Sequence, residues 1–254
     1  MKKDYKLLME TAMLAGELML KSGAETYRTE DTMKRILETS GLQKVEAYVT
    51  VTGMMATMND ETLTQPMTAI YRVSERGTCL YRVMRVNAIS RDYCSGKLSL
   101  EDAYAKLSDM PKKQYSILQY NLAIICIAFG FAMFSKGTLT DVLAAAVAGT
   151  ALSAMITVCK RLKMNAVIYD IITSMSISVS VCLLMEYVWP SINMDIVIIS
   201  AMMPLVPGVA ITNAIRDTLQ GDYVSGGARM LEAFLKAAAI ALGVGVGLAV
   251  MGNL

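Results

Sequence analysis

The chain has 254 residues, 54% of them hydrophobic, and its 24 Lys and Arg side chains against 22 Asp and Glu leave a net charge of only +2. This balance argues against a nucleic-acid-binding surface, which needs a clear excess of basic residues. The absence of histidine excludes catalytic triads that contain it, and five scattered cysteines without a close pair argue against a disulfide framework or a zinc site. We therefore expect no cofactor and no bound metal.

The charged residues divide the chain into two parts. Residues 1–115 contain 17 basic and 15 acidic side chains, whereas residues 116–254 contain only 7 of each. The first part is typical of a water-soluble protein and the second of a protein embedded in lipid. We therefore expect an α+β cytoplasmic N-terminal domain over 1–115, followed by an all-α transmembrane domain of five helices over 116–254.

The first elements of the chain are predicted to be two helices joined by a tight turn. Apolar residues recur at helical spacing over 4–20, and a second helix is predicted over about 24–39. Gly23 is placed to end the first helix in a left-handed conformation. Ser22 and Glu25 have the S-x-x-E spacing of a capping box, which predicts that they cap the second helix.

A small antiparallel sheet is expected next. Segments rich in Val, Thr and Tyr occur at 44–58, 69–73 and 78–86, separated by turn-prone residues, and they predict about three strands. Two further helices are predicted over 88–94 and 99–107, the second one beginning at Ser99.

Five apolar segments follow, each near the roughly 20 residues that cross about 30 Å of hydrocarbon. They cover approximately 117–134, 139–159, 164–188, 192–213 and 232–252.

Basic residues in the short connections between these segments predict the orientation. They favour the cytoplasmic side of a membrane, and here they place the N-terminus in the cytoplasm and the C-terminus outside the cell membrane. The connections predicted to be cytoplasmic contain Lys112, Lys113, Lys160, Arg161, Lys163, Arg216 and Arg229, and the opposite side contains only Lys136.

Two motifs in this layout resemble the threonine/serine exporter family. The first is the SGAETYRTED segment at 22–31. The second combines LVPG at 205–208, TNAIRD at 212–217 and GDYVSG at 221–226. Both occur in the expected order, so that the resemblance covers nearly the whole chain.

The resemblance implies a secondary transporter rather than an ATP-driven one, and the sequence contains no P-loop motif. Members of this family are either single chains of about ten spans or two-subunit systems. With five spans, this chain is similar to the larger subunit, which implies a smaller transmembrane partner subunit, a homo-oligomer or both, in contact with membrane lipid. The implied substrates are small polar organic acids, namely threonine or serine, or a dicarboxylate.

Asp170 is the sharpest candidate for the substrate or ion pathway. It lies seven residues beyond Lys163, about 10 Å of helix rise, where an ionised carboxylate costs several kcal/mol unless it is paired or hydrated. It is expected either to exchange a proton during export or to be satisfied locally at the interface by Lys163 or Tyr169. Glu186 is a second candidate, because it lies near a helix C-terminus, where the helix dipole opposes it.

The fourth apolar segment is predicted to be broken near its centre. Pro204 and Pro207 each remove a backbone donor, and Gly208 follows directly. Such a break offers free carbonyl groups and a helix N-terminus to a ligand, or it is a structural kink.

Asn213, Arg216 and Asp217 share one face of the helix beyond this break. Arg216 is expected either to bind a substrate carboxylate, with Asp217 holding it in place, or to anchor the helix at the membrane surface. Lys236 is expected to form a helix-surface pair with Glu232, four residues earlier. The small residues Gly243 and Gly247 predict close packing of the last helix.

The N-terminal motif leaves three interpretations open. Its candidate residues place two carboxylates and a guanidinium within about one and a half helical turns. They could form a hydrolase-like or sensor site, serve in gating or assembly, or be part of a simple scaffold. These residues are Ser22, Gly23, Glu25, Arg28 and Glu30. We keep a membrane-tethered enzyme or sensor as the alternative to a transporter, and expect no enzymatic activity.

Overall fold

The structure, a computed structural model, describes residues 4–74, 76–111 and 115–252. It is 70% helical, and the described residues form ten α-helices and one small sheet. The chain divides into two compact units. The first comprises Met1–Lys112 together with Gly208–Leu231, and the second comprises Lys113–Pro207 together with Glu232–Leu254.

The first unit begins with two helices, as predicted. Four helices lie in its first segment, before the chain enters the second unit. They are α1 (Tyr5–Lys21), α2 (Thr26–Glu38), α3 (Leu80–Cys94) and α4 (Leu100–Ser108). The buried residues of α1 recur every three or four positions, at Leu8, Ala12, Ala15 and Met19. This spacing produces one apolar face, and its burial against the neighbouring elements stabilises the helix.

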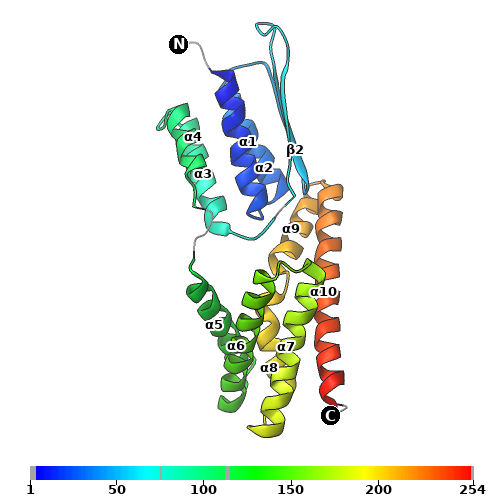
Figure 1. Cartoon of the computed structure of the whole chain (residues 1–254). Coiled ribbons are helices and arrows are strands. Elements are labelled where there is room, and N and C mark those ends of the chain that lie inside the picture. Colours follow the sequence, from blue (N-terminus) through cyan, green and yellow to red (C-terminus); the bar gives the residue numbers. More distant parts are fainter. Residues whose placement is uncertain (1–3, 75, 112–114, 253–254) are drawn as a thin grey trace. The chain divides into compact units, whose positions relative to one another are not determined.

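A three-stranded antiparallel sheet follows α2. Its strands are β1 (Lys44–Thr50), β2 (Gly53–Asn59) and β3 (Met67–Arg72), in the order β1-β2-β3. Val49 pairs with Met54, and both are buried on the face that α1 and α2 cover. Within residues 4–111, Figure 1 shows α1 and α2 between the sheet and the α3–α4 pair.

The strand predicted over 78–86 is wrong, because most of that segment belongs to helix α3. Val83, Val86 and Ile89 are buried at helical spacing and belong to the apolar core of the first unit. Val and Tyr made the segment resemble a strand, but packing of one helical face decided its conformation. The segment predicted as a single strand over 44–58 is instead a hairpin with its turn at residues 51–52.

The predicted fold class is also wrong. The helices begin at residue 5 and the sheet lies between helices, at 44–72, so that no distinct α+β domain precedes an all-α domain. Moreover, residues 208–231 group with the first unit. The change of composition near residue 115 reflects the solvent that the surface of each part is suited to. The fold, by contrast, depends on which faces of the helices and strands pack against one another.

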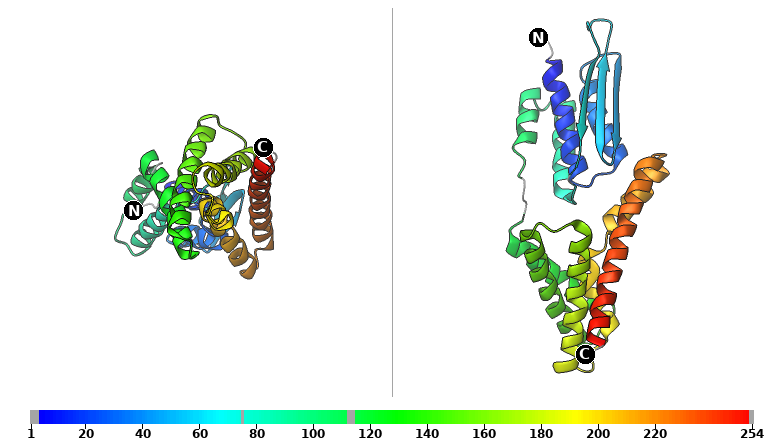
Figure 2. Two further views of the ribbon diagram at one scale, coloured as in Figure 1. Left: turned by 90° about the horizontal axis from the view of Figure 1, so that it is seen from below. Right: turned by 45° about the vertical axis from the view of Figure 1, so that its right-hand side comes forward.

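Among the described residues of the second unit, all regular elements are helices. It contains α5 (Ile117–Phe134), α6 (Leu139–Arg161), α7 (Ala166–Tyr187), α8 (Met194–Met202) and a short 3-10 helix η1 (Met203–Leu205). Helix α6 contacts α5, α7 and α8 through fully buried alanines, including Ala144, Ala145 and Ala148. Figure 2 shows these helices side by side.

Helices α9 (Gly208–Leu219) and α10 (Tyr223–Gly252) complete the chain, and α10 runs from the first unit into the second. Within the described residues, α5, α6, α7 and α10 are long and apolar enough to cross a membrane. A fifth span results if Met194–Leu205 and α9 are counted as one broken segment.

Candidate functional site

The turn between α1 and α2 has a well-defined backbone conformation. Gly23 has a φ of 80°, as its predicted role at the end of α1 requires. The N–H of Ala24 donates to the carbonyl of Met19 and that of Gly23 to the carbonyl of Leu20, at 3.1 and 3.2 Å. This is the Schellman pattern, which satisfies the last carbonyls of α1 and turns the chain sharply into α2.

The predicted capping box is wrong. The residue at the N-cap of α2 is Glu25, which makes no side-chain cap bond, while Ser22 ends α1. Instead, the N–H of Thr26 donates to Oδ1 of Asp217, at 3.1 Å. A carboxylate from α9 thus takes the place that a local side chain normally fills at a helix N-terminus.

Helix α9 supplies two further contacts to the same turn. Asn213 Nδ2 donates to the carbonyl of Gly23 at 2.8 Å, and Arg216 Nη1 donates to Oε1 of Glu25 at 2.6 Å. Asn213, Arg216 and Asp217 therefore act as one face, as their spacing indicates. All of these contacts lie within the first unit.

The segment from Asp222 to Arg229, at the start of α10, completes the arrangement. Arg229 Nη2 donates to the carbonyl of Ala24 at 2.8 Å, and its Nε lies 3.0 Å from Oδ2 of Asp217. Both side chains of this ion pair are almost entirely buried, 8% and 0% exposed. Thr26 Oγ1 also donates to Oδ2 of Asp222, at 3.1 Å.

We call this set of residues the turn cluster: Gly23, Ala24, Glu25, Thr26, Asn213, Arg216, Asp217, Asp222 and Arg229. It joins the two sequence motifs, which are about 190 residues apart in the chain.

The cluster holds Glu25 in its ionised form. Burial alone opposes ionisation, but a backbone hydrogen bond at Glu25 and the guanidinium groups of Arg216 and Arg28 outweigh it and lower the pKa of this carboxyl. Arg28 contributes from the next turn of α2, with Nε 3.5 Å from Glu25 Oε2. Glu30 behaves in the opposite way, because burial raises its pKa although its Oε1 accepts a hydrogen bond from Val49 N at 3.0 Å.

The second unit contains a separate pair of charged residues. Asp170 lies in the second turn of α7 with 7% of its surface exposed, and its Oδ1 is 4.0 Å from Nζ of Lys236 on α10. Lys236 therefore approaches Asp170, a partner that the sequence analysis did not consider. Three hydroxyl residues, Thr173, Ser174 and Ser178, continue the buried polar face of α7.

The family assignment comes from comparison with known proteins. A family model named ThrE and described as "Putative threonine/serine exporter" matches residues 10–251. The chain belongs to this family. Neither a curated protein nor a solved structure matches it. Membership agrees with four to five apolar helices in a multi-pass membrane protein, and a transporter family fits the expectation that the chain is not an enzyme.

Three other candidates lie at the break in the fourth apolar segment. Pro204 is in η1, Pro207 follows it, and Gly208 begins α9, at the boundary between the two units. Glu186 is exposed near the end of α7. Ser22 Oγ accepts a hydrogen bond from Arg82 at 3.5 Å.

Sequence reasoning missed four residues of these sites: Thr26, Asp222, Arg229 and Lys236. Thr26 and Asp222 lie inside the two motifs, so that motif membership could have identified them as candidates. Arg229 was interpreted as part of a cytoplasmic connection and Lys236 as the partner of Glu232. Only packing shows that Asp217 lies beside Arg229 and Asp170 beside Lys236.

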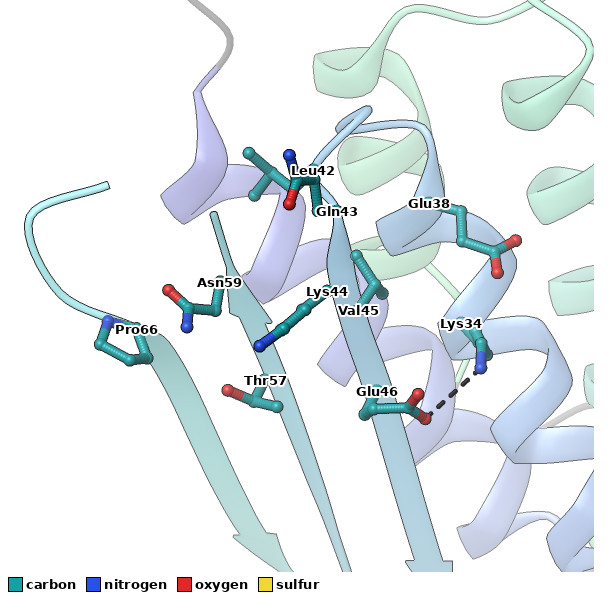
Figure 3. A pocket seen from close by; sticks show the side chains of 10 residues that line it. All are labelled: Lys34, Glu38, Leu42, Gln43, Lys44, Val45, Glu46, Thr57, Asn59 and Pro66. Carbon is teal, nitrogen blue, oxygen red and sulfur yellow. Dashed lines mark hydrogen bonds and ion pairs between the residues drawn. The ribbon is translucent and has the colours of Figure 1, made fainter. Parts of the chain in front are cut away.

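A cavity of 620 Å³ opens beside β1, lined by side chains of α2, β1, β2 and the segment before β3 (Figure 3). An ion pair between Lys34 and Glu46, at 3.4 Å, crosses part of it. None of the predicted site residues lines this cavity.

Proposed function

We propose that the chain is a subunit of a secondary transporter that exports threonine or serine across the membrane, together with a smaller membrane subunit. The observation that carries this proposal is the family match over residues 10–251. The buried polar face of α7 supports it, since charged and hydroxyl side chains inside apolar helices are costly and usually mark a substrate or ion pathway.

Asp170 is the residue that we assign to this pathway, where it meets the substrate or a coupling proton. The break at Pro204, Pro207 and Gly208 supplies further backbone groups to the pathway in this proposal. The turn cluster has a gating or assembly role, because its contacts join α2 to α9 and α10 through a buried ion pair.

The proposal includes the orientation and the partner. Basic residues in the short connections support a cytoplasmic N-terminus and an outer C-terminus in the cell membrane. Large apolar side chains that are exposed on α5 and α10, such as Phe134 and Phe234, provide surface for lipid or for the second subunit. Reporter tags at the two ends of the chain, tested for access from outside the cell, measure the orientation.

Efflux from proteoliposomes tests the function. The full chain is purified with any subunit that co-purifies, and the vesicles are loaded with labelled threonine, serine or succinate. We expect threonine and serine to leave faster than from empty-lipid controls. Efflux of succinate alone would identify a dicarboxylate transporter instead, and efflux of none of the three would contradict the proposal.

A further inference from the structure

Two buried aspartates in the second unit differ in how they are satisfied. Asp141 accepts hydrogen bonds from the N–H of Asn193 and from both the N–H and Oγ1 of Thr138, at 2.7 to 2.8 Å. Asp170 is similarly buried, yet within the described ranges its carboxylate accepts no hydrogen bond and has only Lys236 nearby, at 4.0 Å. A buried carboxylate normally has several close donors, because losing hydration is costly. Asp170 therefore has unused capacity to bind a cation.

Lys236 is held opposite Asp170 by the packing of α7 and α10. These helices run parallel, since Asp170 lies beside Lys236, Ser174 beside Gly243, and Ser178 beside Gly247. At the two glycines the helices approach so closely that a Cβ would collide with backbone or hydroxyl atoms of α7. Deeper contacts of this kind fix the position of α10 along α7, and with it the position of Lys236.

We propose that Asp170 and Lys236 bind the two charged ends of a zwitterionic amino acid, Asp170 the ammonium group and Lys236 the carboxylate. This inference rests on the proposed function and names the substrate class and its contacts. The 4.0 Å between Asp170 Oδ1 and Lys236 Nζ is too long for a hydrogen bond. It suits a ring of four alternating charges, in which the ligand's ammonium and carboxylate groups lie between the two side chains. In such a ring each end of the ligand lies about 2.8 Å from its partner.

The same geometry disfavours a dicarboxylate. One of its carboxylates would bind Lys236, but the other would meet Asp170, and two like charges in an apolar surrounding repel each other strongly. Asp170 would then select for an ammonium group, and the pair would discriminate amino acids from other small acids of similar size.

The test pairs each residue with the ligand group that it binds. Binding to the full chain in nanodiscs, with any co-purifying subunit, is measured for L-threonine, threoninamide, N-acetylthreonine and succinate. Threoninamide lacks the carboxylate and N-acetylthreonine lacks the ammonium group. For the wild type we expect threonine to bind at least about tenfold more tightly than the other three, since each lost charge contact costs about 1.4 kcal/mol or more.

The variants Lys236→Gln and Asp170→Asn should respond differently to these ligands. Lys236→Gln should weaken threonine binding about tenfold and leave threoninamide binding unchanged, because the amide never used the lysine. Asp170→Asn should weaken threonine about tenfold, leave N-acetylthreonine unchanged and bind succinate better than the wild type does. Lys163→Gln and Asp195→Asn, which remove the same charges from exposed positions, should bind all four ligands as the wild type does.

Each possible outcome is decisive. If both variants weaken all ligands equally, the pair has a structural role and the inference is wrong, although threonine efflux by the wild type would still support the proposed function. If the wild type binds succinate more tightly than threonine, both the inference and the proposed substrate are wrong. Unfolding of the variants, followed by the fluorescence of Trp189, shows whether a loss of binding reflects a loss of folding, and Lys236→Arg should then retain threonine binding.

Discussion

The buried ion pair of the turn cluster should determine how firmly the α1–α2 turn is held. The substitution Asp217→Asn removes the charge facing Arg229 but keeps an oxygen that can accept from the N–H of Thr26. Breaking a buried pair by removing one partner costs about 3–5 kcal/mol. We expect a loss near the lower end, about 3 kcal/mol, because the hydrogen bond to Thr26 survives. Asp217→Ala should cost about 1 kcal/mol more, since the helix cap is also lost.

Hydrogen exchange of the backbone amides in residues 22–27 measures this loss directly. If local opening controls exchange, 3 kcal/mol corresponds to roughly a hundredfold faster exchange in Asp217→Asn. Asp31→Asn is the matched control, because it breaks an exposed ion pair with Arg35 in the same helix and should leave this exchange unchanged. Unchanged exchange in Asp217→Asn, or equal exchange in the Asn and Ala variants, would refute the reasoning.

Three further predictions concern single residues. Gly243→Ala should push α10 away from Ser174 and Ile171 and lower the unfolding temperature, which is followed by Trp189 fluorescence. Gly245→Ala is the control, because its added Cβ meets open space and should leave the unfolding temperature unchanged. Equal effects of the two substitutions would contradict the packing of α10 on α7. Gly23→Ala should destabilise the turn by about 1–2 kcal/mol, seen as faster exchange at 22–27, because its φ is 80° and a Cβ would lie 2.9 Å from the carbonyl of Gly77. Since folding lowers the pKa of Glu25 from 4.5, its carboxylate stabilises the turn above pH 4.5 and this contribution disappears as the pH falls through the lowered value. Exchange at 22–27 should therefore accelerate below pH 4.5 in the wild type and much less in Glu25→Gln, and an equal acceleration in both would exclude Glu25 as the cause.

Local sequence was sufficient where a helix has a strong apolar face or a distinctive end. The 4–20 prediction agrees with α1, and the glycine expected to end that helix is Gly23 with its positive φ. Thr138 and Asp141, three residues apart, form a capping box at the start of α6, which shows that such a box does form where both side chains are local to the helix end. The family motifs were also visible, and the family match covers them both.

Local sequence failed where distant residues compete with near ones. The capping box of Ser22 and Glu25 does not form. The N–H of Thr26 donates to Asp217 instead, and the side chain of Glu25 accepts a hydrogen bond from Arg216. The strand expected over 78–86 became part of a helix because its apolar residues pack on one side. The predicted roles of the individual candidate residues in transport stay predictions.

The sequence by itself determined that the C-terminal part has long apolar helices, that charge is scarce within them, and which two motifs matter, since composition and helical spacing are properties of neighbouring residues. Only the tertiary structure decided that these motifs meet in one cluster, that Arg229 pairs with Asp217, and that Lys236 faces Asp170. Such contacts depend on how helices pack against one another. Asp170 and Lys236 are more than sixty residues apart and the two motifs about 190, and no periodicity in the sequence records that packing.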